Sequence, residues 1–142
     1  MSHAGKTRVL FVCIGNACRS PMGEAIARKD AGDVIEASSA GLYPMGMIPG
    51  MTQTTLEKNG YSASGLQSKG LRDIASENVD LVINLSGYER ARALEKFAQV
   101  ENWEVSDPYG ADDATYQRIL EEIRGRVGEL AQRLRAQQHA AV

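Results

Sequence analysis

The sequence predicts a three-layer α/β fold, in which four parallel strands form one sheet and helices flank both of its faces. Short apolar runs alternate with helix-like segments along the whole chain, and no repeat, low-complexity tract or long linker interrupts them. A strand–helix order repeated about four times favours a parallel sheet whose connections cover its faces. The chain has 142 residues. This length suits one domain, which we expect to span residues 1–142.

Four short runs of residues predict the strands of this sheet. They are residues 8–12, 34–38, 80–85 and 101–105. The first and third runs are mostly apolar, which is typical of strands that are buried on both faces. The glycine- and proline-rich residues 41–50 and the polar residues 106–110 predict loops.

Four further segments predict helices. The first begins at Ser20 and Pro21, because Ser is a good N-cap and Pro is favoured at the first helical position, and it ends near Gly32. Residues 52–59 and 88–97 predict the second and third helices. The last segment has apolar residues at three- and four-residue steps, as an amphipathic helix does. These residues are Tyr116, Ile119, Ile123, Val127, Leu130 and Leu134.

The composition excludes several classes of protein. Sixteen Lys and Arg against 18 Asp and Glu leave a net charge of −2, which argues against a dedicated nucleic-acid binder. No apolar run is long enough to span a membrane or to form the core of a signal peptide. Two cysteines do not make a disulfide framework. We therefore expect a cytoplasmic protein that binds neither nucleic acid nor a membrane.

The two cysteines lie on one short loop, with the sequence Cys-Ile-Gly-Asn-Ala-Cys-Arg-Ser-Pro at residues 13–21. Consecutive amides in such a loop, together with the following helix N-terminus, form an anion-binding concavity. The fork of Arg19 suits phosphate oxygens, and Cys13 in the same positive field is a thiolate nucleophile. Ser20 is placed to hydrogen-bond the sulfur, and Asn16 to hold the loop in shape. The predicted phosphate-binding residues are Ile14, Gly15, Asn16, Ala17, Cys18, Arg19 and Ser20.

Other kinds of site fit this loop poorly. It lacks the Gly-Lys-Ser/Thr ending of a nucleotide-binding loop, and four residues separate its cysteines, unlike a thioredoxin Cys-x-x-Cys. The only histidines, His3 and His139, lie near the chain ends, so we expect no metal and no cofactor. Taken alone, Cys13 is typical of a buried structural cysteine and Asp107 of a turn residue. Both follow predicted strands, however, which predicts that they meet at one edge of the sheet.

The motif Cys-x-Gly-Asn-x-Cys-Arg-Ser-Pro at residues 13–21, after an apolar strand, resembles the signature of the low-molecular-weight protein tyrosine phosphatases. Asp-Pro-Tyr at residues 107–109, Ser-Ala-Gly at residues 39–41 and the long terminal helix also match that family. The resemblance covers nearly the whole chain. It implies a flavodoxin-like fold with a four-stranded parallel sheet flanked by helices, in agreement with the pattern above.

The resemblance also implies a role for each motif residue. Cys13 would be the nucleophile, Arg19 would hold the phosphate, and Asp107 would be the general acid and later the general base. The supporting hydrogen-bond network would consist of Asn16, Ser20 and Ser39. It further implies that Cys13 and Cys18 pair reversibly under peroxide. The alternative for Cys18 is a small packing residue.

The predicted walls of the pocket mouth differ from those of familiar family members. They are Tyr43, Met45, Met47 and Tyr109. Tyr109 is suited to stacking on a phenyl ring, whereas Tyr43 and Met47 have the alternative of packing on surface helices. Asn84, at the carboxyl end of a predicted strand, is expected either to line the site or to cap the strand.

The predicted function is hydrolysis of protein phosphotyrosine and small aryl phosphates through a phosphocysteine, with inorganic phosphate as product. The resemblance leaves open an arsenate reductase, which needs further thiols, or a phosphoarginine phosphatase, in which Thr tends to stand where this chain has Ile14. A non-catalytic anion-binding module and a phosphocysteine carrier are further alternatives, but neither requires a carboxylate at Asp107. We expect a monomer or weak dimer.

Overall fold

A computed structural model describes residues 5–140, so that His3 and the side chain of His139 lie outside the described part. In chain order the elements are β1 (Thr7–Cys13), α1 (Arg19–Asp30), β2 (Ile35–Gly41), α2 (Gly50–Lys58), η2 (Leu71–Asp73), η3 (Ser76–Asn78), β3 (Leu81–Asn84), η4 (Arg92–Leu94), β4 (Val100–Asn102) and α3 (Asp113–Ala140). Within this part, no helix combines the length and the apolar character that a membrane span requires.

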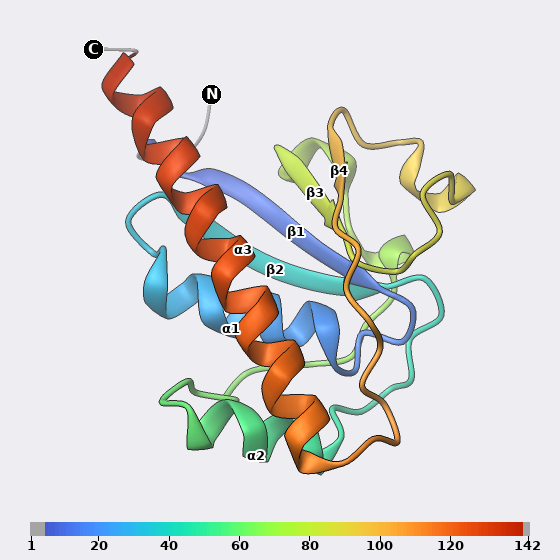
Figure 1. The fold of residues 1–142 in the computed structure, drawn as a ribbon. Helices are drawn as coiled ribbons and strands as arrows, with labels where there is room; N and C mark the ends of the chain where they lie inside the picture. Colours follow the sequence, from blue (N-terminus) through green and yellow to red (C-terminus); the bar gives the residue numbers. More distant parts are fainter. Residues whose placement is uncertain (1–4, 141–142) are drawn as a thin grey trace.

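The four strands form one parallel sheet in the order β2-β1-β3-β4 (Figure 1). The predicted four-stranded parallel α/β fold is therefore confirmed. The strand order changes direction between β1 and β3, and ligands of such sheets bind at the carboxyl edge near this point. Cys13 pairs with Gly41 at the end of β1, and Val12 pairs with Asn84 of β3. The fold thus brings the loop after β1 to the middle of that edge.

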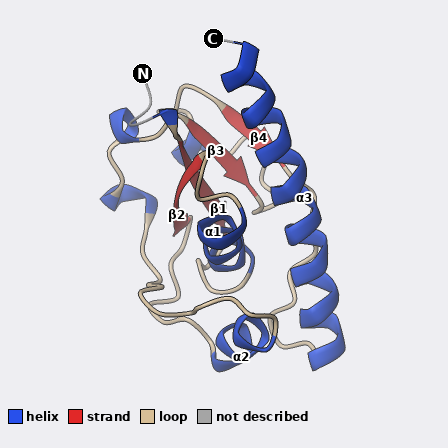
Figure 2. Cartoon of the chain, turned by 90° about the vertical axis from the view of Figure 1, so that its left-hand side faces the viewer, coloured by secondary structure: helices blue, strands red, loops and turns tan. Residues whose placement is uncertain are grey.

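Helices α1 and α3 pack together on one face of the sheet, as Figure 2 shows. The close approach of α1 to β1 depends on Gly23, because a Cβ there would lie 2.6 Å from the ring of Phe11. Phe11 in turn meets Trp103 edge to face, with 6.1 Å between ring centroids. The six apolar positions predicted for the last helix are all buried along α3. That prediction is confirmed.

A smaller apolar cluster covers the opposite face of the sheet. The prediction of a helix over residues 88–97, on this face, is wrong. Residues 88–97 do not form an α-helix but a turn followed by η4. The buried side chains of this segment recur every three residues, at Leu94 and Phe97, with Ala91 partly buried. Hydrogen bonds from Leu94 N to Ala91 O and from Phe97 N to Leu94 O follow the same three-residue step. That spacing suits a 3₁₀ turn, in which residues three apart lie on one side.

The start of α1 also differs from the prediction. The helix begins at Arg19 with Cys18 at the N-cap position, and no side chain caps it. Ser20 is not the N-cap, because its hydroxyl oxygen accepts a hydrogen bond from Asn16 Nδ2 (2.8 Å) and lies 3.0 Å from Cys13 Sγ. The Cys18 side chain makes no capping bond, and the amide of Ser20 in the first turn donates instead to Cys13 Sγ (3.4 Å).

An ion pair between Arg8 and Asp80 fixes the start of β1 beside β3. The carboxylate of Asp80 accepts hydrogen bonds from Arg8 N (2.8 Å), Nε (3.1 Å) and Nη2 (3.0 Å). These bonds hold the pKa of Asp80 below its usual range. A carboxyl with a lower pKa in the folded state stabilises the protein above its unfolded pKa, and the stabilisation is lost as the pH falls through the folded value.

We therefore expect the free energy of unfolding to decrease as the pH falls below about 4, the unfolded pKa of Asp. Asp80→Asn is expected to cost about 1 kcal/mol at pH 7 and to weaken this acid dependence. Urea unfolding from pH 7 to pH 2.5 measures both effects. Asp73→Asn is the control, because the Asp73 side chain has no hydrogen bond or ion pair within residues 5–140. Equal acid sensitivity of the wild type and Asp80→Asn would contradict the expectation.

Candidate active site

A pocket of about 250 Å³ opens at the carboxyl edge of the sheet, where β1 leads into α1. It is lined by Cys13, Ile14, Gly15, Ala17, Cys18, Arg19, Tyr43, Met45, Asp107 and Tyr109. In Figure 1 the segment between β4 and α3 passes the end of β1, which brings residues far apart in sequence to one pocket. The fold therefore gathers the predicted nucleophile, the predicted acid and the predicted phosphate-binding arginine around one space.

The loop after β1 turns its carbonyls toward the surrounding protein. Three of them accept hydrogen bonds from the segment after β2: Cys13 O from Leu42 N (3.0 Å), Ile14 O from Tyr43 N (2.8 Å) and Gly15 O from Met45 N (2.8 Å). The carbonyl of Ala17 accepts from Thr52 Oγ1 (2.9 Å). In a trans peptide the N–H points opposite to the C=O. The amides of Ile14, Gly15, Asn16 and Cys18 consequently point away from these partners, as an anion-binding loop requires.

Asn16 holds the loop in this shape from behind. It has a positive φ of 48°, a conformation that Asn tolerates better than most residues. Its Oδ1 accepts from Lys69 N (2.9 Å), and its Nδ2 donates to Ser20 Oγ (2.8 Å) and Ser39 Oγ (3.0 Å). The structure thus brings the three predicted network residues together. Asn16 and Ser20 do not line the pocket themselves, because their side chains are directed into this network.

Glu24 extends this network, and the sequence analysis missed it. Its Oε1 accepts a hydrogen bond from Ser39 Oγ (2.5 Å). Its other oxygen forms an ion pair with Arg28 one helical turn later. Glu24 is only 2% exposed, and a buried carboxylate needs such partners. The available signal was an acidic residue four positions after Ser20 and four before Arg28, on the same face of the predicted helix.

Cys13 is buried at the base of the pocket. Its Sγ lies 3.0 Å from Ser20 Oγ and 3.4 Å from Ser20 N, which donates to it. Asn16 donates to the Ser20 oxygen, so the Ser20 hydroxyl has its hydrogen for one of two acceptors, Cys13 Sγ at 3.0 Å or Ala40 O at 3.5 Å, of which the sulfur is the nearer. Both donors from Ser20 stabilise a thiolate more than a thiol.

Arg19 is held rigidly beside this sulfur. Its Nη1 donates to the carbonyls of Leu85 (2.6 Å) and Val105 (3.1 Å), which follow β3 and β4. Its Nε is buried and forms no hydrogen bond within residues 5–140. A buried donor without an acceptor costs about 1–3 kcal/mol. A tetrahedral anion in the pocket, which Arg19 lines, is the kind of acceptor that this donor lacks.

Asp107 lies on the pocket wall contributed by the loop after β4. Its Oδ2 is 3.6 Å from Arg19 Nη2, and its Oδ1 accepts a hydrogen bond from Tyr109 N (3.1 Å). The side chain is 47% exposed, so water and a leaving group both have access to it. This is the position that a proton donor to a departing group needs.

The predicted substrate walls are only partly assembled. Tyr43, Met45 and Tyr109 line the pocket, and the exposed rings of Tyr43 and Tyr109 border its mouth. Met47 does not line it, because the chain reverses at Gly46, which has a φ of 93°. Met47 is left 62% exposed instead.

Cys18 lines the pocket together with Cys13. The Cys18 thiol lies 3.5 Å from Tyr116 Oη, and burial raises its pKa. Both cysteines are free and line the same pocket, so their reversible pairing stays a prediction.

Asn84 does not line the pocket. Its Nδ2 donates hydrogen bonds to Tyr88 O and to Asn102 Oδ1. It therefore organises the end of β3, the second of its two predicted roles.

The sequence model of the low molecular weight phosphotyrosine protein phosphatase family matches residues 8–140. The chain belongs to this family. Within residues 5–138, no group of three His, Cys, Asp or Glu side chains gathers where it would hold a metal ion. Cys13, Arg19 and Asp107 all lie within the residues that the family model matches.

Proteins similar to this chain carry different activities in their names. An arsenate reductase from Bacillus licheniformis is 31% identical over 135 residues, which cover 89% of this chain and 96% of that one. The structure of a low molecular weight protein tyrosine phosphatase from T. tengcongensis has 31% identity and a TM-score of 0.78, covering 90% and 99%. The YwlE arginine phosphatase from Geobacillus stearothermophilus, with 23% identity and a TM-score of 0.81 over 94% and 96%, shares the fold.

Gly41, at the end of β2, lies directly against the backbone of the loop after β1. A Cβ on Gly41 would lie 2.7 Å from Asn16 N and 2.9 Å from Ile14 O, both backbone atoms. Gly41→Ala must therefore displace the loop, and displacements of this kind cost about 1–3 kcal/mol in stability. Because about 1 Å of misplacement is enough for a 10²-fold loss of rate, we expect kcat to fall by about 10- to 100-fold.

Thermal unfolding and turnover of p-nitrophenyl phosphate measure these two effects. The control is Gly125→Ala in α3, where an added Cβ meets nothing within 4 Å. This control is expected to keep its activity and to gain about 0.5–1 kcal/mol in stability. Full activity of Gly41→Ala would show that the loop tolerates the shift.

Proposed function

We propose that the protein is a cysteine-dependent phosphomonoesterase that hydrolyses aryl phosphates, with phosphotyrosine in proteins as its substrate. One observation carries the proposal: Cys13 and Asp107 line the same small pocket, beside a loop that presents its amides and Arg19. This combination supplies a nucleophile, a proton donor and an anion-binding site. A binding module has no use for the nucleophile or the acid.

In the first step, the Cys13 thiolate attacks the phosphorus of a bound monoester. The sulfur–phosphorus bond forms while the bond from phosphorus to the phenolic oxygen breaks. Asp107 gives its proton to that oxygen, so that a neutral phenol leaves. The loop amides and Arg19 stabilise the negative charge on the transferring group.

In the second step, water replaces the phenol. Asp107, now a carboxylate, accepts a proton from the water, whose oxygen attacks phosphorus while the sulfur–phosphorus bond breaks. Inorganic phosphate and the Cys13 thiolate result. Ser20 favours this departure, because its amide and hydroxyl both lie within hydrogen-bonding reach of the sulfur. Two moderate barriers thus replace one very high one.

The pocket mouth favours an aromatic ester. Tyr43 is 75% exposed and Tyr109 57% exposed, and both border the pocket. Exposed rings at this place are available to stack on the phenyl group of a substrate. The shape of the mouth therefore supports phosphotyrosine over an aliphatic phosphate.

Arsenate reduction is the second candidate, because the arsenate reductase from B. licheniformis is so similar over nearly its whole length. Reducing arsenate to arsenite takes two electrons, which two thiols supply when they become a disulfide. The chain has only one other cysteine, Cys18. Burial raises its pKa and so keeps it protonated, which makes it a poor nucleophile. A reductase built on this chain would depend on an external thiol such as glutathione.

Phosphoarginine hydrolysis is less well supported. The arginine phosphatase YwlE is similar in fold, but Ile14 lines the pocket directly after the nucleophile. The family resemblance associates Thr at that position with phosphoarginine. The aromatic mouth gives no particular advantage to a guanidinium group over a phenyl ring.

Parallel assays distinguish the three activities. Purified protein is supplied with phosphotyrosine, phosphoarginine, or arsenate plus glutathione, and phosphate or arsenite is measured. We expect phosphotyrosine to have the highest kcat/KM, orthovanadate to compete with it, and EDTA to have no effect. Faster arsenite formation than phosphotyrosine hydrolysis would overturn the proposal.

A further inference from the structure

A second, larger groove lies beside the active-site pocket. It encloses about 910 Å³ and is lined by Leu42, Tyr43, Gly87, Tyr88, Glu89, Arg90, Ala91, Arg92 and Ala93. Tyr43 lines both this groove and the active-site pocket. Its amide donates to Ile14 O in the phosphate loop, which fixes the backbone of Tyr43 at the boundary. The two spaces therefore adjoin at this residue.

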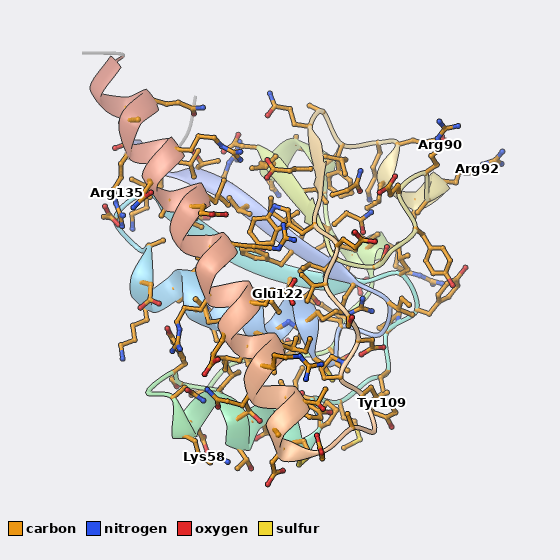
Figure 3. The ribbon with its side chains drawn as sticks, in the orientation of Figure 1. Lys58, Arg90, Arg92, Tyr109, Glu122 and Arg135 are labelled. Carbon is orange, nitrogen blue, oxygen red and sulfur yellow. The ribbon has the colours of Figure 1, made fainter. Side chains whose placement is uncertain are left out.

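Two arginines give the groove a positive charge. Arg90 and Arg92 are exposed, and neither has an ion pair or a hydrogen bond from its side chain within residues 5–140. Figure 3 shows both extending outward from the same side of the molecule. Glu89 is the one acidic residue in the lining. By contrast, Arg133 and Arg135 on α3 are paired with carboxylates.

The backbone under these arginines is anchored at both ends. Tyr88 N donates to Ser86 Oγ (3.1 Å), and Tyr88 O accepts from Asn84 Nδ2 (3.0 Å). On the other side, Leu94 is buried against the sheet. The charged side chains thus project from a positioned turn, with the half-exposed ring of Tyr88 beside them. A surface of this kind loses less conformational entropy on binding than a flexible loop does.

We infer that this groove binds the polypeptide segment next to the phosphorylated tyrosine and selects acidic side chains in it. The inference rests on the proposed phosphatase function. When a phosphotyrosine occupies the pocket, its main chain must leave through the mouth, and Tyr43 is the wall that the mouth shares with the groove. Carboxylates in the neighbouring segment then meet Arg90 and Arg92, both of which have their guanidinium forks free. The partner is a phosphoprotein segment rich in Asp and Glu.

The charge pattern explains why the selection concerns acidic segments. A lining with two arginines and one glutamate attracts carboxylates and repels basic segments. Exposed ion pairs are each worth only a factor of about 1.4 to 5 in affinity. The groove therefore contributes preference among phosphoproteins, whereas the pocket supplies the chemistry.

The test compares two phosphotyrosine peptides and free phosphotyrosine. The peptides are identical except that Asp and Glu on both sides of the phosphotyrosine in one are Asn and Gln in the other. We expect the wild type to prefer the acidic peptide in kcat/KM. In the double variant Arg90→Gln, Arg92→Gln, this preference is expected to fall by about three- to tenfold, mainly through KM, and added salt should weaken it in the wild type. Hydrolysis of free phosphotyrosine should not change.

Lys58→Gln is the matched control, because Lys58 is an exposed cation on α2, far from both arginines in Figure 3. It should leave the peptide preference intact. Equal use of both peptides by the wild type, or an unchanged preference in the double variant, would overturn the inference. Failure of the phosphatase proposal has a different signature, namely no hydrolysis of free phosphotyrosine by the wild type, and it would overturn both.

Discussion

Cys13→Ser is expected to reduce the turnover of p-nitrophenyl phosphate by about 10⁴- to 10⁶-fold, the scale seen when a covalent nucleophile is removed. A serine hydroxyl is not ionised near neutral pH, and Asp107, which carries the proton for the leaving group in the first step, does not serve as a base for it. Ser20 supplies donors to the sulfur, which stabilise a thiolate but do not remove a proton from a hydroxyl. The step that forms the covalent intermediate is therefore lost.

Anion binding should survive this substitution. The loop amides and Arg19 remain, and the bonds from Leu42, Tyr43 and Met45 that orient the loop do not involve the Cys13 side chain. Isothermal titration with inorganic phosphate is expected to give a Kd within about tenfold of the wild-type value. Cys18→Ser is the control for removing a thiol from the same pocket, and it should keep most of the activity. Residual activity of Cys13→Ser above about 1% of the wild type would refute covalent catalysis by this residue.

Asp107→Asn should reduce kcat by about 10²- to 10⁴-fold with phenyl phosphate, the usual contribution of a general acid. Asparagine has nearly the same size and keeps an oxygen for the bond from Tyr109 N, but it has no proton to give to the leaving oxygen. Nitrophenol is a much better leaving group than phenol. The loss should therefore be clearly smaller with p-nitrophenyl phosphate.

A series of substituted phenyl phosphates measures this difference as the slope of log kcat against the pKa of the leaving phenol. The slope should be steeper in Asp107→Asn than in the wild type. Asp113→Asn, which removes an exposed carboxylate at the start of α3, should leave the slope unchanged. Equal losses for all leaving groups would assign Asp107 to substrate binding and not to proton transfer.

Local sequence patterns predicted an element correctly where the spacing of its apolar residues fits only one type of secondary structure. The terminal helix belongs to this group, because a long stripe such as that from Tyr116 to Leu134 fits only an α-helix. The four strands were predicted from short runs bounded by turn residues, and the fourth is shorter than the expected residues 101–105, since β4 ends at Asn102. The prediction failed for residues 88–97, where apolar residues spaced by three fit both a 3₁₀ turn and an α-helix. It also failed for Ser20, whose hydroxyl bonds Asn16 and Cys13 in place of the helix amides. In both segments, contacts with distant parts of the chain decided between local alternatives.

The sequence by itself was enough to predict the nucleophile and the anion-binding loop of the candidate site. Cys13, Arg19 and the small residues between them lie within seven consecutive positions, where local chain geometry already dictates a loop entering a helix. Only the tertiary structure decided what surrounds that loop. Asp107 reaches it because β4 lies at the edge of a sheet centred on β1 and β3. Glu24 joins the network, and Arg90 and Arg92 line the adjoining groove, because packing brings separate segments together. Local propensity carries no information about such long-range neighbours.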